Sequence, residues 1–259
     1  MAFKHILGVI FASIFFISNI MFVVFFFLYV YAKVKKQPKS NIKKRKIATL
    51  ICLVACLMLF FILPVFTMRM ESTSMMARKP IIYLYPEKET DISVKLGLPK
   101  QIAHSYPKYT TGWKVHAEPD GTLTDSETGR ELYSLYYESE CVEPYKQTNE
   151  GFCIAGKDTI CFLEEKLSIL GLNEREAEEF IIYWLPKLES NEYNYIRFAT
   201  KEEIDKNMPL DIQPKPDTTI RVMMIYKGLG EPINVQEQKL RPVERRGYTA
   251  VEWGGTFPG

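Results

Sequence analysis

The chain has 259 residues, of which 47% are hydrophobic and 25% charged, and its net charge is +2. This average hides two unlike parts: residues 1–76 carry ten basic side chains and one acid, whereas the remainder carries 23 basic and 30 acidic side chains. The net charges are therefore +9 and −7. A basic, apolar N-terminal part joined to an acidic part argues against a one-domain cytosolic enzyme and a disordered chain. It also argues against a nucleic-acid-binding protein, so no nucleic acid is expected as a partner.

Two long uncharged segments lie in the N-terminal part. Residues 6–32 and residues 47–68 form runs of 27 and 22 residues without a charged side chain. A helix needs about 20 apolar residues to cross a hydrocarbon core of ~30 Å, so both runs predict transmembrane helices, the first preceded by a short tail at residues 1–5. The alternative for the first run is a signal peptide cleaved after Ala32, although such apolar runs are usually only ~7–15 residues long.

The segment between the two runs predicts the orientation. Residues 33–46 contain eight cationic side chains and no acid, and short basic loops stay on the cytoplasmic side of a membrane. We therefore expect a multi-pass protein of the cell membrane with two spans, whose N-terminus and C-terminal domain lie outside. The lipid bilayer is then its first partner, and residues 69–79 form a polar linker to an extracytoplasmic domain at residues 80–259.

The beginning and end of this C-terminal domain show the patterns of β-strands. Ile92, Val94 and Leu96 alternate with polar residues, the period of two that is typical of a half-buried strand. Comparable alternation or β-branched and aromatic runs predict further strands. The predicted strands are 80–85, 92–96, 113–117, 132–137, 195–198, 210–212, 219–226 and 250–253.

Helical spacing separates the two groups of strands. Apolar residues spaced three and four apart predict a helix over residues 158–170 that stops at Gly171. A second helix is predicted to start at Asn173, with Glu176 completing a capping box. The predicted fold class is therefore α+β: a two-helix transmembrane hairpin followed by a mainly antiparallel β domain with a helical hairpin.

Several stretches of the C-terminal domain carry a family likeness. They are KPIIYLYPEKETDISVKL (79–96), YPKYTTGWKVHAEPDGTL (106–123), GRELYSLYYE (129–138), the long run at 151–198 that includes FLEEKLSILGLNEREAEEFIIYWLPKLE, and TAVEWGG (249–255). Together these stretches cover most of residues 79–255, and the domain resembles an uncharacterised bacterial protein family. The resemblance implies no reaction, cofactor or catalytic residue, and it does not include the two apolar N-terminal runs.

A search for catalytic motifs returns mainly absences. Residues 80–259 contain no G-x-S-x-G, H-E-x-x-H, P-loop, G-x-G-x-x-G or C-x-x-C motif. Their two histidines, His104 and His116, lack partners at the spacing of a zinc site, so neither a metal nor a cofactor is expected. Cys153 and His116 are the weak catalytic candidates, since a thiolate nucleophile needs a neighbouring base; the alternative for Cys153 is simple burial.

Three cysteines of this domain also raise the question of a disulfide. In an oxidising exterior, two of Cys141, Cys153 and Cys161 could pair and leave one free thiol. Cys161 is expected to lie on or beside the first predicted helix, so Cys141–Cys153 is the preferred pair. The alternative is that all three remain unpaired.

Aromatic side chains are unusually frequent in the first half of the domain. Tyrosines and tryptophans can stack on sugars or anchor a partner protein, and the alternative is that most of them pack in the core. The excess comprises Tyr106, Tyr109, Trp113, Tyr133, Tyr136 and Tyr137. We select Tyr106, Tyr109, Trp113 and, near the C-terminus, Trp253 as candidate binding residues.

These observations leave three hypotheses about function. The first is a membrane-anchored extracytoplasmic binding module at the bacterial cell surface, whose partner is an envelope protein or a cell-wall polymer. The second is an extracytoplasmic hydrolase or transferase of unrecognised type. The third is a membrane component of a transport or immunity system. Because catalytic motifs are missing and aromatic residues are frequent, the sequence favours the first and leans against an enzyme.

Overall fold

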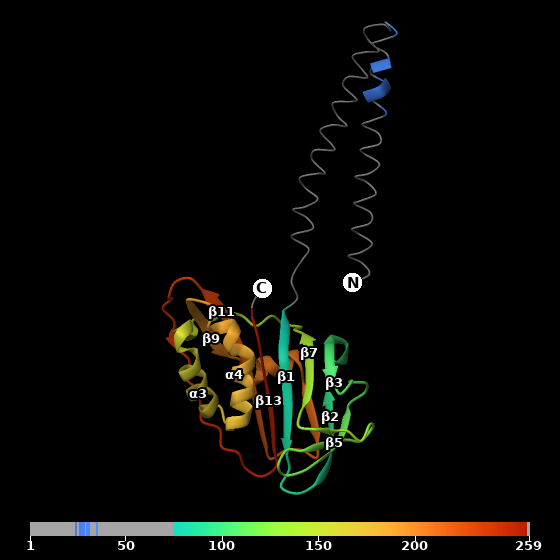
Figure 1. Ribbon diagram of the computed structural model, residues 1–259, viewed down its shortest axis with the longest axis vertical. Helices are drawn as coiled ribbons and strands as arrows, with labels where there is room; N and C mark the ends of the chain where they lie inside the picture. The colour runs from blue at the N-terminus through green and yellow to red at the C-terminus, as the bar shows by residue number, and fades with distance from the viewer. Residues whose placement is uncertain (1–23, 25, 29, 32–34, 36–74, 258–259) are drawn as a thin grey trace. The chain divides into compact units, whose positions relative to one another are not determined.

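The computed structural model describes residues 24, 26–28, 30, 31, 35 and 75–257 (Figure 1). The chain divides into two compact units, Met1–Thr73 and Ser74–Gly259. The strands and helices below belong to the second unit, so its first strand begins inside the predicted linker at residues 69–79.

The expected fold class needs a correction in its membrane part. Where the structure describes the chain, it contains no helix of the length and apolar character needed to cross a membrane. The predicted tail, spans and basic loop lie outside the described residues, apart from positions 24, 26–28, 30, 31 and 35. The described structure is mainly β with a smaller helical part. The predicted two-span hairpin and the membrane localisation that depended on it are therefore not supported, and the bilayer partner stays a prediction.

The strands of residues 75–257 form two sheets. The larger sheet has eight strands in the order β12-β8-β9-β11-β13-β1-β7-β3, and the smaller has five in the order β10-β2-β4-β5-β6. The strands are β1 (Met76–Tyr85), β2 (Thr90–Leu96), β3 (Ile102–Tyr106), β4 (Trp113–Ala117), β5 (Leu123–Asp125), β6 (Glu131–Leu132), β7 (Leu135–Glu140), β8 (Glu150–Ala155), β9 (Tyr193–Phe198), β10 (Leu210–Gln213), β11 (Thr218–Leu229), β12 (Gln236–Glu237) and β13 (Thr249–Thr256).

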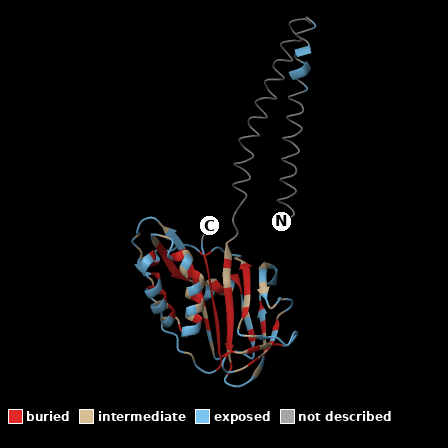
Figure 2. Ribbon diagram, viewed as in Figure 1, coloured by how far each residue is buried: buried red, intermediate tan, exposed pale blue. Residues whose placement is uncertain are grey.

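Most neighbouring strands run antiparallel, and the exceptions are the parallel pairs β11–β13 and β12–β8. The centre of the larger sheet is β13, which lies between β11 and β1 and is buried along its whole length (Figure 2). A strand buried on both faces is expected when other layers cover both faces of the sheet.

Helices cover one face of the larger sheet. Helices α3 (Thr159–Ile169) and α4 (Glu174–Leu188) pack there through Leu163, Leu167, Phe180 and Trp184, against alternate residues of the central strands (Figure 1). A short 3-10 turn, η2 (Gly156–Asp158), leads into α3, and another, η1 (Pro99–Gln101), precedes β3.

The five-stranded sheet covers much of the opposite face. Ile82 and Leu84 of β1 point into this second core, whereas Ile81 and Tyr83 belong to the helical side, as the period of two in a strand requires. Helix α5 (Lys201–Asn207) places Ile204 against Met223 and Ile225 of β11 in a third, smaller cluster. The domain therefore has a helical layer, a large sheet, and a smaller sheet with α5.

Several local predictions are confirmed. Helix α4 begins with the capping box in which the Asn173 side chain accepts the Glu176 N–H and Glu176 accepts the Asn173 N–H. Gly171, at φ 87°, follows α3 as expected for a residue that ends a helix in the left-handed region. The strands β3, β5, β8 and β12 and the helix α5 were not predicted, and the single strand predicted at residues 132–137 is divided between β6 and β7.

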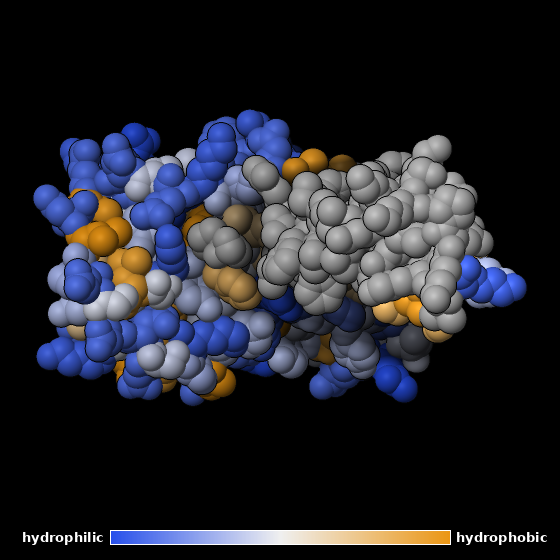
Figure 3. All heavy atoms as spheres, turned by 90° about the horizontal axis from the view of Figure 1, so that it is seen from above, coloured by the Kyte–Doolittle hydropathy of each residue, from blue (hydrophilic) through white to orange (hydrophobic). Residues whose placement is uncertain are grey.

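The described surface mixes polar and apolar side chains. On the face shown in Figure 3, apolar side chains form small groups among polar ones wherever grey atoms do not cover them. Single exposed apolar residues are normal on a protein surface. A functional site is therefore better sought in a cavity that gathers particular side chains.

Candidate functional site

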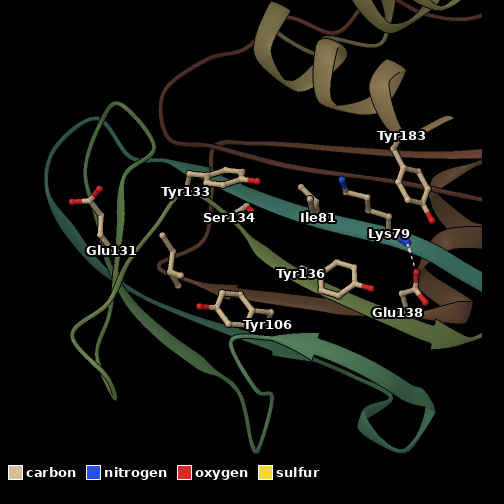
Figure 4. A pocket seen from close by; sticks show the side chains of 10 residues that line it. Lys79, Ile81, Tyr106, Glu131, Tyr133, Ser134, Tyr136, Glu138 and Tyr183 are labelled. Carbon is tan, nitrogen blue, oxygen red and sulfur yellow. Dashed lines mark hydrogen bonds between the residues drawn. The ribbon is translucent and has the colours of Figure 1, made fainter. Parts of the chain in front are cut away.

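One cavity gathers tyrosines from distant parts of the sequence. It has a volume of about 570 Å³ and lies beside α4, on the helical side of the larger sheet (Figure 4). Four of its lining residues are tyrosines, and a lysine and two glutamates supply charge. The lining residues are Lys79, Ile81, Tyr106, Glu131, Leu132, Tyr133, Ser134, Tyr136, Glu138 and Tyr183. We call this cavity the tyrosine pocket.

The floor of the tyrosine pocket is the edge of the eight-stranded sheet. The edge strand β3 pairs with β7 so that Tyr106 lies opposite Tyr136 and His104 lies opposite Glu138. Directly opposed residues point to the same face of a sheet. The apolar core on this side includes no fully buried residue of β3 or β7, so Tyr106 and Tyr136 form a platform at the edge.

Helix α4 contributes Tyr183 to the wall of the pocket, and the neighbours of Tyr183 along one face of the helix hold it in place. Arg175, Glu179, Tyr183 and Lys187 are spaced four residues apart and therefore lie along one stripe of the helix. Arg175 lies over the ring of Tyr133, with Cζ 4.8 Å from the ring centroid. Glu179 Oε2 accepts a hydrogen bond of 2.9 Å from the Tyr83 hydroxyl. Tyr183 itself lines the pocket, and Lys187 Nζ lies 3.6 Å from its ring centroid.

A break in β1 brings Lys79 into the pocket. The register of β1 shifts between residues 78 and 81 against β13 and between residues 77 and 81 against β7, which marks a bulge. Lys79 has φ 51°, a left-handed conformation that is uncommon outside glycine. Bulges re-aim side chains, and here the Lys79 Nζ lies 5.0 Å from the Tyr183 ring centroid and 5.6 Å from that of Trp253.

The two glycines of the VEWGG stretch explain how the bulge and α4 fit the sheet. A Cβ at Gly254 would lie 3.1 Å from Pro80, the residue after Lys79. A Cβ at Gly255 would lie only 2.5 Å from Cζ2 of Trp184 in α4. Small residues are therefore needed at both positions for β1 and the helix to approach β13 as closely as they do.

Glu138 is held by positively polarised groups at one end of the pocket. Its Oε1 accepts the backbone N–H of Lys79 at 3.3 Å, and its Oε2 lies 3.7 Å from Arg78 Nη1. Burial and then the charge of Glu138 raise the pKa of Tyr136 to about 12 and also raise the pKa of Tyr183. Both phenols therefore remain protonated near neutral pH and are available as hydrogen-bond donors.

The second carboxylate of the pocket is remote from the first. Glu131 comes from β6, and Figure 4 shows it at the opposite end of the cavity from Glu138. Glycoside hydrolysis needs two carboxyl groups that flank one bond. The arrangement of Glu131 and Glu138 is instead that of two separate polar groups, with tyrosine rings between them.

The sequence candidates for binding separate into one pocket residue, one partly buried residue (Tyr109) and two buried ones. Tyr106 lines the pocket with 51% of its surface exposed. Tyr109 and Trp113 belong to the core between the sheets, where their rings meet edge to face at 4.9 Å. Trp253 is fully buried in the helical-side core, directly below the Lys79 ammonium.

The structure does not bring the catalytic candidates together. Cys153 lies in β8 of the larger sheet, where its Sγ accepts the Ile233 N–H at 3.3 Å. His116 lies in β4 of the smaller sheet and is hydrogen-bonded through Nδ1 to Asp91 at 2.9 Å. No contact between Cys153 and His116 occurs in the described residues, so the structure adds no support to this pair.

The preferred disulfide is also not formed. Cys141, Cys153 and Cys161 are all free thiols. Cys141 packs against the small cluster around α5, and burial raises the pKa of its thiol to about 12. Within residues 75–257 and the few others described, no group of three or more His, Cys, Asp or Glu side chains is placed to hold a metal ion.

The spacing of four along α4 was a usable sequence signal, but only the apolar face of that helix entered the sequence prediction.

Comparison of the chain with models of known protein families, with curated proteins and with solved structures finds no match. The resemblance to an uncharacterised bacterial family therefore stays a prediction, and the tyrosine pocket is the feature that bears on function.

Proposed function

We propose that this chain is a binding module and that its ligand is a saccharide held in the tyrosine pocket. The observation that carries the proposal is the convergence of Tyr106, Tyr133, Tyr136 and Tyr183 on one open cavity. These residues come from β3, the turn between β6 and β7, β7 itself and α4. Nothing in the local sequence at any one of these places requires its tyrosine ring to lie partly exposed beside the other three rings.

The chemistry of the lining suits a sugar. A tyrosine presents an apolar ring face for the C–H groups of a pyranose and a hydroxyl for its oxygens. The remaining polar groups, Ser134, Glu131 and Glu138, are few and lie around these rings. Small-molecule sites are usually cavities of ~300–1,000 Å³ with mainly apolar and aromatic walls and a few placed polar groups, and a cavity of about 570 Å³ falls within that range.

The proposal keeps the binding role expected from the sequence and leaves out the membrane anchor. A saccharide also belongs to the chemical class of the cell-wall polymers that the sequence favoured as partners. The hydrolase alternative is less well supported, because Glu131 and Glu138 lie apart and Cys153 and His116 share no contact in the described residues.

Isothermal titration of the full chain with a panel of neutral and acidic oligosaccharides tests the proposal. We expect at least one member to bind, and Tyr106→Ala to weaken that binding about tenfold, equivalent to about 1.4 kcal/mol. Ile182→Ala is the matched control, because Ile182 is a 66% exposed residue of α4 that does not line the pocket. Binding that Ile182→Ala weakens as much as Tyr106→Ala, or no binding across the panel, would refute the proposal.

A further inference from the structure

Positive charge accumulates at the Tyr183 end of the pocket. Arg78, Lys79 and Lys187 all approach this end, where Glu138 is the carboxylate that faces them. Burial, and then the charges of Lys79 and Arg78, lower the pKa of Lys187. Three cations therefore share one anion, and this end of the pocket has an excess of positive charge.

Glu138 does not neutralise the ammonium group of Lys79. Its two oxygens are directed to the backbone N–H of Lys79 and to Arg78. Within the described residues, the Lys79 ammonium makes no ion pair, whereas Lys166, Lys201 and Lys206 each have a carboxylate partner. The Lys79 ammonium lies over the rings of Tyr183 and Trp253.

The backbone fixes this ammonium in place. Lys79 adopts its left-handed conformation within the β1 bulge, and the bulge fits against Gly254 of β13. A left-handed conformation in a residue other than glycine is strained and is often found at functional sites. An ammonium held over two aromatic faces also retains free hydrogen-bond donors for a ligand.

From this arrangement we infer that the pocket selects anionic saccharides, and that the Lys79 ammonium binds the acidic group of the sugar while the tyrosine rings bind its body. The inference rests on the proposed function and specifies its ligand class. A carboxylate, a sulfate ester or a phosphate ester offers the same charged oxygens to Lys79. Glu131, at the far end of the pocket, disfavours a second acidic group there, so the preferred ligand carries its charge at one end.

Pairs of sugars that differ in charge but not in ring structure separate the effect of charge on binding from the effect of shape. The full chain is titrated with an oligosaccharide that ends in one uronic acid and with the methyl ester of the same sugar, and in parallel with galactose oligomers that carry one terminal sulfate or phosphate group and with their neutral parent. We expect the anionic member of a pair to bind at least tenfold more tightly than the neutral member in low salt. The preference should narrow as salt is added, because salt screens a partly exposed charge pair. The three anions together identify which acidic group is preferred.

Variants of Lys79 test whether its ammonium group causes the preference for anionic sugars. Lys79→Gln should bring the anionic and neutral sugars within about twofold of each other without removing the binding of the neutral sugar. Lys79→Arg should retain the preference, since it keeps the charge. Lys95→Gln, at an exposed lysine of β2, is the matched control and should behave like the unaltered chain. Circular dichroism confirms that each variant is folded.

The outcomes distinguish this inference from the proposed function. Equal binding of charged and neutral sugars by the unaltered chain overturns the inference and leaves the saccharide-binding function standing. A preference that survives in Lys79→Gln overturns the assignment to Lys79. Failure of every sugar to bind refutes the proposed function itself.

Discussion

The wall of the tyrosine pocket depends on one buried ion pair at the start of α4. Glu176 is fully buried, and its carboxylate accepts hydrogen bonds of 2.8 and 3.1 Å from the guanidinium of Arg245. It also accepts the N–H of Asn173 at 2.9 Å in the capping box. Arg245 in turn lies over the ring of Tyr85, with Cζ 4.9 Å from the ring centroid.

Removing the Arg245 guanidinium should destabilise the fold more than neutralising the Glu176 carboxylate. In Arg245→Met, the Glu176 carboxylate remains buried without its cation, and loss of one partner of a buried pair costs about 3–5 kcal/mol. Because 26% of the Arg245 side chain is exposed, we expect the lower end, about 3 kcal/mol. In Glu176→Gln, an amide oxygen still accepts from Asn173 and Arg245, so the loss is about 1 kcal/mol, the difference between charged and neutral hydrogen bonds.

The double variant tests the mechanism. Once Glu176 is neutral, removal of Arg245 no longer leaves a buried charge unpaired, so Arg245→Met/Glu176→Gln should lose less stability than the two single changes added together. We expect a coupling energy of about 1–2 kcal/mol, within the usual range for residues in contact.

Urea denaturation of the full chain, followed by tryptophan fluorescence, measures these free energies of unfolding. The three tryptophans of the chain, Trp113, Trp184 and Trp253, are all buried in the domain and report its unfolding. The reasoning is refuted if Glu176→Gln is the more damaging single change, or if the double variant loses the full sum.

Two further predictions concern packing and pH. Gly255→Ala should lower the free energy of unfolding by about 1–3 kcal/mol, because the new methyl group overlaps Trp184. Gly230→Ala is the control: its methyl group enters open space, so the free energy of unfolding should change by no more than about 0.5 kcal/mol in the same denaturation assay. Equal losses in the two variants would contradict the packing argument. The hydrogen bond that His116 donates to Asp91 raises the pKa of His116 above 6.5, so its contribution to stability is present in full below pH 6.5 and is lost as the pH rises through the raised pKa. Asp91→Asn should move the His116 pKa back toward 6.5 in an NMR titration, and an unchanged pKa would contradict the assignment.

Elements with a strong local signal could be predicted from the sequence. The alternation in β2 and β4 and the Asn173–Glu176 capping box each follow from a few neighbouring residues, and the structure has them at the expected positions. Helix α5 carried a comparable signal, a Thr200–Glu203 capping box, but it has only seven residues and its apolar pattern is short. The strand β3 lies at a sheet edge with no fully buried residue, so its sequence lacks the usual alternation.

The pocket could be predicted only in part, because register and layer packing create it. Tyr106 was selected for its aromatic ring, but its meeting with Tyr136 depends on how β3 pairs with β7. The position of Tyr183 in the pocket depends on which face of α4 packs against the sheet. The role of Lys79 depends on a bulge whose position no local pattern indicates. Conversely, Trp253 is a tryptophan, a residue type that is common in binding sites, but it lies in the central strand of the larger sheet and is buried there.

The most direct test of the account is an NMR titration of the full chain labelled with carbon-13 in its tyrosine rings. The oligosaccharide that ends in one uronic acid is added, and tyrosine-to-phenylalanine variants assign the signals. If the tyrosine pocket is the binding site, the signals of its four tyrosines, Tyr106, Tyr133, Tyr136 and Tyr183, shift with a common affinity. Tyr145 and Tyr248, which are buried in other cores, should not move. Unchanged pocket signals at saturating sugar, or shifts confined to tyrosines outside the pocket, would contradict the claim that this cavity is the binding site.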